Sequence, residues 1–258
     1  MNVRLCRFGR DWVGEVGGAA LPLAGTVGIV ASGAAVDAFG AEAGRLSEQV
    51  LGGDEAAFGR VSPCPPWSVA ELLYHVRIGA GRVAGMLAGP EPAGGPLISA
   101  AGYFRAGERF SPAVNDDRIA AAQRGAAGLG TGAAVARDFD RAWRESWAQA
   151  QQAAQARVVR TRHGDRMLLT EYLRTRVLEL AVHGLDLAAG LGRPPWLTDA
   201  AAHVVAQLFL PAGALCRLLD ESGWDQLTLI AKATGRLPLT QAETTLTERH
   251  NLRRLRFA

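Results

Sequence analysis

The clearest pattern of apolar positions follows the sequence CPPW. From Ser68 onward, apolar residues recur at intervals of three and four, which predicts an amphipathic helix over 68–88. Ser68 can serve as the N-cap of this helix, and Glu71 stands at the spacing that completes a capping box. His75 lies at the edge of the apolar stripe. The helix is therefore expected to turn a titratable imidazole toward the protein interior.

Three further segments carry a helical pattern of apolar residues. They predict helices over 34–51, 133–157 and 170–190, and the last of these stops near a glycine and two prolines. Segments rich in glycine and proline separate the helices. Four substantial helices joined by loops predict a mainly α-helical fold in the form of a bundle.

The segments outside these helices are less regular. VVRTRHGDRMLLT is typical of a short extended piece with a His-Gly-Asp turn, whereas WDQLTLIAKATGRLPL fits either a strand or a helix. We divide the chain into a loosely ordered N-terminal extension over 1–33, a helical bundle over 34–195, and a small α or α/β extension over 196–258.

Composition and charge narrow the classes of partner. Hydrophobic residues make up 48% of the chain and charged residues 21%, which is typical of a soluble globular protein with a substantial core. The formal charge is only +3, and no basic stripe alternates with aromatic residues, so we expect no nucleic-acid partner. The apolar stretch LPLAGTVGIVASGAAVDAFGA is short and interrupted by glycines, which argues against a membrane helix. The three cysteines are widely spaced and form no CxxC motif, which fits a reducing cytoplasm.

One pair of residues in the helix over 170–190 points to metal chemistry. Glu179 and His183 stand four residues apart, so a helix places both on one face, one turn apart. Such a pair can bind a divalent ion if a third ligand comes from another helix, and His75 is the natural candidate. A His-Glu-His set leaves coordination positions open for water or substrate. The pair alone is also typical of a solvated helix surface, but burying three unpaired polar groups would cost roughly a few kcal/mol each, and a metal ion would satisfy all three.

The two histidine-bearing segments together resemble a known family. They are SPCPPWSVAELLYHV and, about a hundred residues later, YLRTRVLELAVHGLDLAAGLGRPPW. In combination they look like the mycothiol-dependent maleylpyruvate isomerase-like proteins, which are actinobacterial members of the DinB-like four-helix bundle superfamily. The resemblance runs from about Val36 to the C-terminus and implies a metal ion, commonly zinc, held by His75, Glu179 and His183. Residues 1–35 have no counterpart in this pattern, and the C-terminal part is shorter than the separate substrate-binding domain of the true isomerase.

Other residues are candidates for supporting roles. Asp186 can orient a ligand histidine through a hydrogen bond. Arg174, Arg176 and Arg236 can bind a carboxylate of the thiol or of the substrate, although a surface ion pair is the alternative role for each. Cys64 is not expected to be a ligand, because a helical path would place it on the order of 16 Å from the histidine of the helix over 68–88.

These observations favour a metal-dependent enzyme that uses a low-molecular-weight thiol, which the family resemblance identifies as mycothiol. A thiol bound to a divalent metal loses its proton. The thiolate can then add to an activated double bond, which leads to cis–trans isomerisation, or displace a leaving group, which is S-transfer. The expected partners are this thiol and a small electrophile, in a cytoplasmic monomer or homodimer.

Two alternative functions remain open at this stage. Two histidines and one carboxylate can also form the facial triad of a non-haem iron oxygenase. A non-enzymatic metal-binding or regulatory module would use a metal only for its structure, or would hold none.

Overall fold

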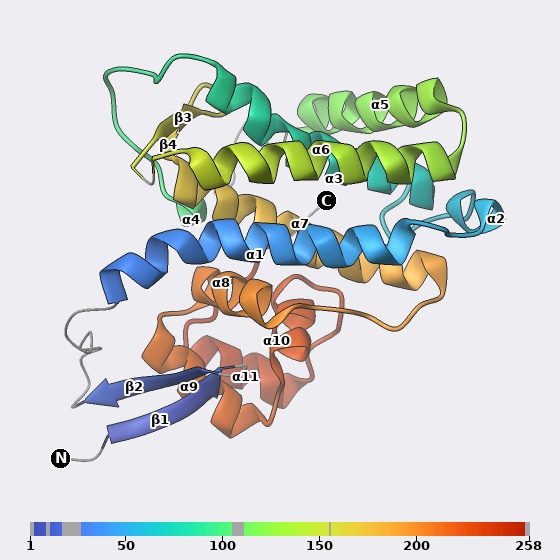
Figure 1. The fold of residues 1–258 in the computed structure, drawn as a ribbon. Coiled ribbons are helices and arrows are strands. Elements are labelled where there is room, and N and C mark those ends of the chain that lie inside the picture. The colour runs from blue at the N-terminus through green and yellow to red at the C-terminus, as the bar shows by residue number, and fades with distance from the viewer. Residues whose placement is uncertain (1–2, 9–10, 17–26, 105–110, 155, 256–258) are drawn as a thin grey trace.

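Four long helices form the centre of the molecule. The computed structural model describes residues 3–8, 11–16, 27–104, 111–154 and 156–255. The central helices are α1 (Val27–Val50), α3 (Val69–Ala88), α6 (Gly132–Gln152) and α7 (Leu169–Leu191). α1 and α3 each pack against both α6 and α7 (Figure 1). The predicted mainly α-helical bundle is therefore confirmed.

Two observed helix limits differ from the predicted ones. α1 begins before the predicted start at residue 34, because Gly28 and Gly33 weaken the helical pattern without ending the helix. α6 ends at Gln152, short of its predicted end, since Ala153 has extended backbone angles (φ −74°, ψ 146°). The predicted start of the bundle thus falls inside α1, and the division of the chain into three parts stays a prediction.

Further elements precede the four central helices or lie between them in the chain. The structure describes a hairpin of β1 (Val3–Phe8) and β2 (Asp11–Val16), then α2 (Glu55–Phe58), α4 (Ala100–Tyr103) and α5 (Pro112–Leu129). The two strands of the hairpin are antiparallel. α4 packs on α7, and α5 packs on α3 and α6.

The start of α3 follows the sequence signals closely. Ser68 is the N-cap, and its hydroxyl accepts a hydrogen bond from the backbone N–H of Glu71 at 3.3 Å. The Glu71 carboxylate accepts in return from the backbone N–H of Ser68 at 2.7 Å, so the predicted capping box is confirmed. Trp67 and Leu72, on either side of the cap, are both buried. The capping box and these two buried side chains together fix where α3 begins, and therefore which of its residues face α7.

α7 runs through the interior between α1, α3 and the C-terminal helices. It follows directly on the antiparallel hairpin of β3 (Val158–Arg160) and β4 (Arg166–Leu168), whose turn has Gly164 in the left-handed region (φ 85°). The predicted His-Gly-Asp turn is thus confirmed. At its other end α7 stops at Gly192, which is also left-handed (φ 68°). Because most of α7 is buried, its polar side chains must find partners inside the protein.

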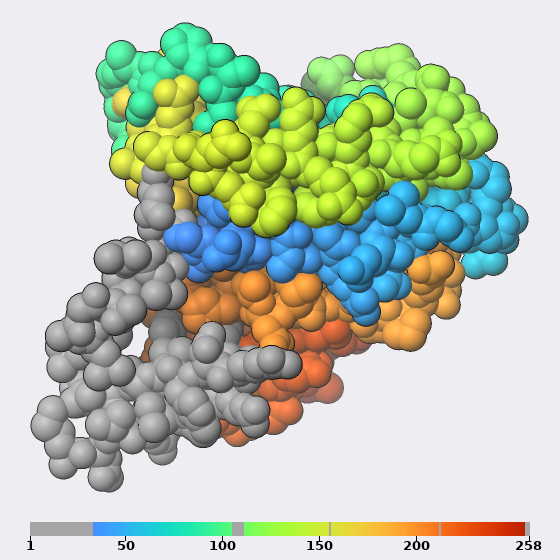
Figure 2. All heavy atoms as spheres, viewed as in Figure 1, coloured from blue at the N-terminus to red at the C-terminus, as the bar shows by residue number. Residues whose placement is uncertain are grey.

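The C-terminal part forms a layer of shorter helices on the α1 and α7 side of the bundle. They are α8 (Asp199–Phe209), α9 (Ala212–Ser222), α10 (Gln226–Ala233) and α11 (Gln241–Arg249). In Figure 2 this layer, in orange to red, lies below α1. The segment WDQLTLIAKATGRLPL, for which the sequence allowed either a strand or a helix, contains the helix α10. Asp225 caps this helix, and its Leu229 and Ile230 are buried.

The helices were compared with the length and apolar composition that a membrane span needs. Among the described residues, no single helix is both long and apolar enough to cross a membrane, while the bent pair Asp199–Phe209 and Gly213–Ser222 passes by length and composition only.

Candidate metal centre

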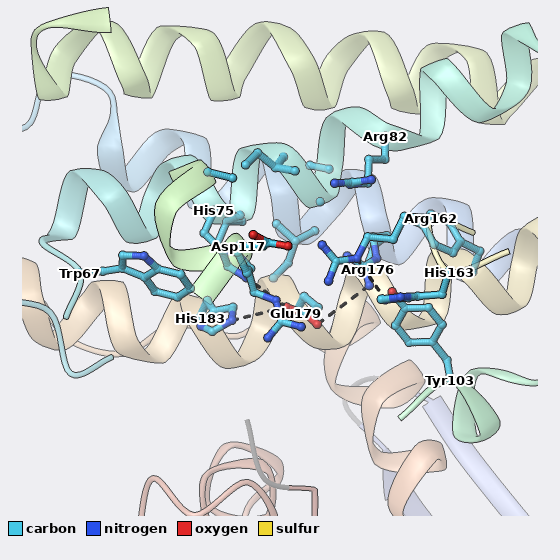
Figure 3. A pocket seen from close by; sticks show the side chains of 18 residues that line it. Trp67, His75, Arg82, Tyr103, Asp117, Arg162, His163, Arg176, Glu179 and His183 are labelled. Atoms are coloured by element: carbon cyan, nitrogen blue, oxygen red, sulfur yellow. Dashed lines mark hydrogen bonds and ion pairs between the residues drawn. The ribbon is translucent and has the colours of Figure 1, made fainter. Parts of the chain in front are cut away.

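A cavity of about 300 Å³ opens between α3, α5, α7 and the turn of the β3–β4 hairpin. Figure 3 shows its two ends. Trp67, His75 and His183 lie at one end, and Arg82 and Arg162 lie at the other, together with Tyr103 of α4. Glu179 lies between the two groups.

His75, Glu179 and His183 converge at the first end. His183 and Glu179 lie one turn apart on α7, and their Nε2 and Oε2 atoms are 3.4 Å apart. The Nε2 atom of His75, on α3, is 3.8 Å from the same Oε2 atom. The ligand atoms of the three residues all lie within 4.8 Å of one another. A zinc ion about 2 Å from each ligand requires separations of this order, so the donor set fits a divalent ion.

The surroundings of His75 keep its ring neutral and fixed. The ring stacks on Trp67 with centroids 4.7 Å apart and an angle of 24° between the planes. It meets the ring of His183 edge-on, with centroids 5.2 Å apart. Burial lowers the pKa of His75 to about 4. Near neutral pH the ring is therefore uncharged and has the lone pair that a metal ion needs.

The other two donors form a charged pair. Burial alone would raise the pKa of Glu179, but hydrogen bonds from His183 and His75 and the charge of Arg176 hold it well below its usual range. Burial alone would lower the pKa of His183, but Asp186, Cys64 and Glu179 raise it well above its ordinary value. A divalent ion at this position would replace the proton on the His183 ring, since metal binding needs the deprotonated ligand.

Hydrogen bonds through Asp186 hold the His183 ring on the side away from Glu179. Its Nδ1 atom lies 3.0 Å from Oδ2 of Asp186, which is buried on the same helix. Arg236 donates to both oxygens of this carboxylate, from Nε to Oδ1 at 3.1 Å and from Nη2 to Oδ2 at 2.8 Å. Burial would raise the pKa of Asp186, but its bonds with His183 and Arg236 keep it well below its usual range. Asp186 therefore lies where it can orient the His183 ring, and the role predicted for it stays a prediction.

Cys64 lies at this network, contrary to the distance argument from the sequence. Its Sγ atom donates to Oδ2 of Asp186 at 3.1 Å, and Cys64, His183 and Asp186 have ligand atoms within 4.8 Å of one another. The large separation predicted for Cys64 was wrong, because the chain before α3 does not follow a helical path. The chain instead folds back before α3, with the N–H of Ser62 bonded to the carbonyl of Trp67 at 2.9 Å. The two prolines after Cys64 were the signal against a helical path.

The three arginines predicted to bind a carboxylate are placed differently. Arg176 lines the cavity, and its guanidinium lies 5.1 Å from the Tyr172 ring centre. Arg174 pairs with Glu171 at 2.9 Å and is not among the lining residues. Arg236 is not among them either, since it binds Asp186 behind the histidine. Only Arg176 is therefore in a position to meet a molecule inside the cavity.

Three further arginines that line the cavity were missed from the sequence. Arg82 of α3, Arg118 of α5 and Arg162 of the hairpin turn line the same cavity as Arg176. Burial lowers the pKa of both Arg82 and Arg118, and repulsion by the neighbouring guanidiniums contributes. The available signal was spacing: Arg82 follows His75 by two helical turns, which places both on one face of α3.

One glycine makes room for this cationic group. A Cβ atom on Gly79 of α3 would lie 2.9 Å from Nη1 of Arg176. The small residue thus lets the Arg176 guanidinium lie against the α3 backbone inside the cavity.

A family model matches the part of the chain that carries this site. The family model described as mycothiol maleylpyruvate isomerase N-terminal domain matches residues 39–188. A crystal structure of the mycothiol-dependent maleylpyruvate isomerase is similar with a TM-score of 0.47 and 16% sequence identity, over 68% of each chain. No curated protein matches the sequence. The family match includes His75, Glu179 and His183 but ends before Arg236.

Proposed function

The chain belongs to the mycothiol maleylpyruvate isomerase N-terminal domain family, and on that premise we propose that it is a divalent-metal-dependent enzyme that uses a low-molecular-weight thiol, mycothiol. Its second substrate is a small electrophile with carboxylate groups. The observation that carries this proposal is the convergence of His75, Glu179 and His183 at one end of a cavity whose other end is lined by arginines.

The three converging residues would hold the metal ion. When bound, a divalent ion such as zinc supplies Lewis acidity and favours the thiolate form of a thiol. His75 contributes a neutral nitrogen that Trp67 keeps in place, and Asp186 fixes the His183 ring so that its Nε2 atom faces Glu179. The carboxylate of Glu179 supplies the negative charge that a divalent ion requires.

The arginines that line the cavity would bind and orient the electrophile. Arg82, Arg118, Arg162 and Arg176 face a space in which Asp117 and Glu179 are the acidic lining residues. Guanidinium groups match carboxylates in shape and charge, and several of them together favour a molecule with more than one carboxylate. Held in this way, an activated double bond would lie between the arginines and the thiolate.

The reaction then needs no nucleophile from the protein. The thiolate sulfur forms a bond to one carbon of the double bond, and the electron pair of that bond moves onto the conjugated carbonyl. Rotation about the resulting single bond, followed by loss of the thiolate, gives the isomer. Protonation of the neighbouring carbon instead gives a thiol conjugate. The guanidiniums would stabilise the negative charge that develops on the carbonyl oxygen.

The experiment measures the isomer and the thiol conjugate that zinc-loaded protein forms from the electrophile in the presence of the thiol. Wild-type protein is mixed with mycothiol and maleylpyruvate, or with a related unsaturated dicarboxylate, and isomer and conjugate are measured by chromatography. The expected result is thiol-dependent turnover that is lost in Glu179→Gln and kept in Arg144→Gln, whose side chain is exposed and pairs with Asp140. Equal rates with and without thiol would contradict the proposal, as would oxygen uptake by iron-loaded protein without any thiol reaction.

A further inference from the structure

We infer that Arg236 is a positioning residue of the metal centre, which acts through Asp186 to fix the ring of His183. The C-terminal part of the chain, which lies beyond the family match, would then help to set the affinity for the metal ion. This inference rests on the proposed function, because it concerns the same three ligands.

The hydrogen bonds form an unbroken chain from Arg236 to the ligand atom. Both oxygens of Asp186 accept from Arg236, at 3.1 and 2.8 Å, in the two-pronged geometry that orients a carboxylate best. Oδ2 of the same carboxylate lies 3.0 Å from Nδ1 of His183. An ionised carboxylate only accepts hydrogen bonds, so Nδ1 must donate to it. The Nε2 atom, 3.4 Å from Glu179, is then the ring nitrogen that can bind an ion.

Arg236 is itself held by the end of α10. Its backbone N–H donates to the carbonyl of Ala231 at 2.7 Å, and its Nη1 atom donates to the carbonyl of Thr234 at 3.0 Å. Gly235, between Thr234 and Arg236, adopts a left-handed conformation (φ 78°) that turns the chain back toward α7. α10 in turn packs on α7 and α8. The guanidinium is therefore fixed by the fold and does not depend on the metal for its position.

A carboxylate as buried as Asp186 depends on its cationic partner. Its side chain is 3% exposed, whereas an exposed ion pair would contribute little. Without Arg236, the carboxylate would keep its charge with fewer donors or would take up a proton. In either case the hydrogen bond between Asp186 and the His183 ring would change. Loss of such an outer partner of a metal ligand typically weakens metal binding by about 10- to 100-fold.

The experiment compares the zinc affinity of variants along this chain of bonds. Zinc dissociation constants are measured by competition with a coloured chelator for wild type, Arg236→Gln, Arg236→Lys, Asp186→Asn and the double variant Asp186→Asn with Arg236→Gln. The matched control is Arg249→Gln, because Arg249 also lies in the C-terminal part and pairs with a carboxylate, that of Glu221, at the surface. Circular dichroism and thermal melting without zinc show which variants are folded.

The expected result is a loss of affinity of about 10- to 100-fold in Arg236→Gln and in Asp186→Asn. The double variant should bind no more weakly than Asp186→Asn alone, since both changes break one pathway. Arg236→Lys should lie between wild type and Arg236→Gln, because lysine keeps the charge but not the two-pronged geometry. If Arg236→Gln does not fold, Asp186→Asn and Arg236→Lys still test the pathway.

Three outcomes would overturn the inference. Wild-type zinc affinity in folded Arg236→Gln would overturn it and leave the proposed function intact. Fully additive losses in the double variant would also overturn it alone, because they would show two independent effects. Absence of zinc binding by the wild-type protein would overturn the proposed function, and the inference with it.

Discussion

The two ends of the cavity differ in the charge of the group that each can hold. At one end, the neutral ring of His75 and the anionic Glu179 face a point that suits a cation. At the other end, Arg82, Arg162 and Arg176 face a space that suits an anion. Arg176 and Glu179 meet at the border, with Nη2 and Oε1 3.9 Å apart.

With this difference in charge, one small cavity can bind a cation at one end and an anion at the other. The metal end is built on residues whose protonation is controlled by burial and by partners behind them, whereas the arginine end keeps its charge at any physiological pH. An electrophile bound at the arginines would be held beside the metal ligands without competing for them. The two ends should therefore respond separately to mutation.

The largest effect of a single substitution is expected on zinc affinity, at the metal end of the cavity. Glu179→Gln removes the only anionic ligand of the His75, Glu179 and His183 set, so zinc affinity should fall by more than the roughly 100-fold that loss of an outer partner costs. Binding of an unsaturated dicarboxylate, followed by tryptophan fluorescence, should be no weaker, because the arginines remain. A parallel loss of dicarboxylate binding would show that the two ends act as one.

The reverse effect is expected from Arg176→Gln. Hydrogen bonds to charged groups contribute about 1.5–3 kcal/mol, so dicarboxylate binding should weaken by about 10- to 100-fold. Zinc affinity, measured by chelator competition, should change much less, since Arg176 is not a ligand. Arg144→Gln serves as the control for removal of an arginine from the protein surface. An equal loss of zinc affinity in Arg176→Gln would contradict the separation.

The metal end should also respond to pH through His75. Its folded pKa of about 4 lies below the ordinary value of 6.5, so between these values the unfolded chain binds a proton that the folded chain does not. The stability that the neutral ring contributes is thus present above pH 6.5 and is lost as the pH falls toward 4. Between pH 7 and pH 5, metal-free wild type should lose about 2 kcal/mol more unfolding free energy than His75→Gln.

Urea unfolding in the presence of a chelator measures this difference. The comparison with His75→Gln cancels the titration of the other carboxylates and histidines to first order. Equal slopes of unfolding free energy against pH in the two proteins would mean that the His75 ring is not held neutral by burial.

The smallest effect is expected from Gly79→Ala. The added Cβ atom would lie 2.9 Å from Nη1 of Arg176, so the guanidinium must shift. Dicarboxylate binding should weaken by about three- to tenfold, and zinc affinity should stay unchanged. Gly85→Ala is the matched control on the same helix, because its Cβ would meet nothing within 4 Å. A similar change in both variants would point to a general effect of alanine on α3.

The sequence could predict those parts of the site that depend on local spacing. The capping box at Ser68 fixes the start of α3, and the interval between Glu179 and His183 places both on one face of α7 whatever surrounds them. His75 could be added because it interrupts an apolar stripe. Each of these signals lies within a single helix, where geometry follows from the sequence alone.

The remaining parts depend on how distant segments pack. Arg82, Arg118 and Arg162 come from α3, α5 and a hairpin turn, and no local pattern relates them to one another. Cys64 reaches Asp186 only because the chain folds back before α3. Arg236 meets Asp186 across 50 positions of sequence, through the packing of α10 on α7. Such contacts are set by tertiary structure, which spacing does not reveal.

The most direct test of the central claim is the amount of zinc that the protein binds. Wild type, His75→Ala and Glu179→Gln are dialysed against zinc, and the bound metal is measured by elemental analysis. We predict about one ion per chain in wild type and almost none in either variant, since His75 and Glu179 come from different helices and share one site. No bound zinc in wild type, or the same amount in all three proteins, would contradict it.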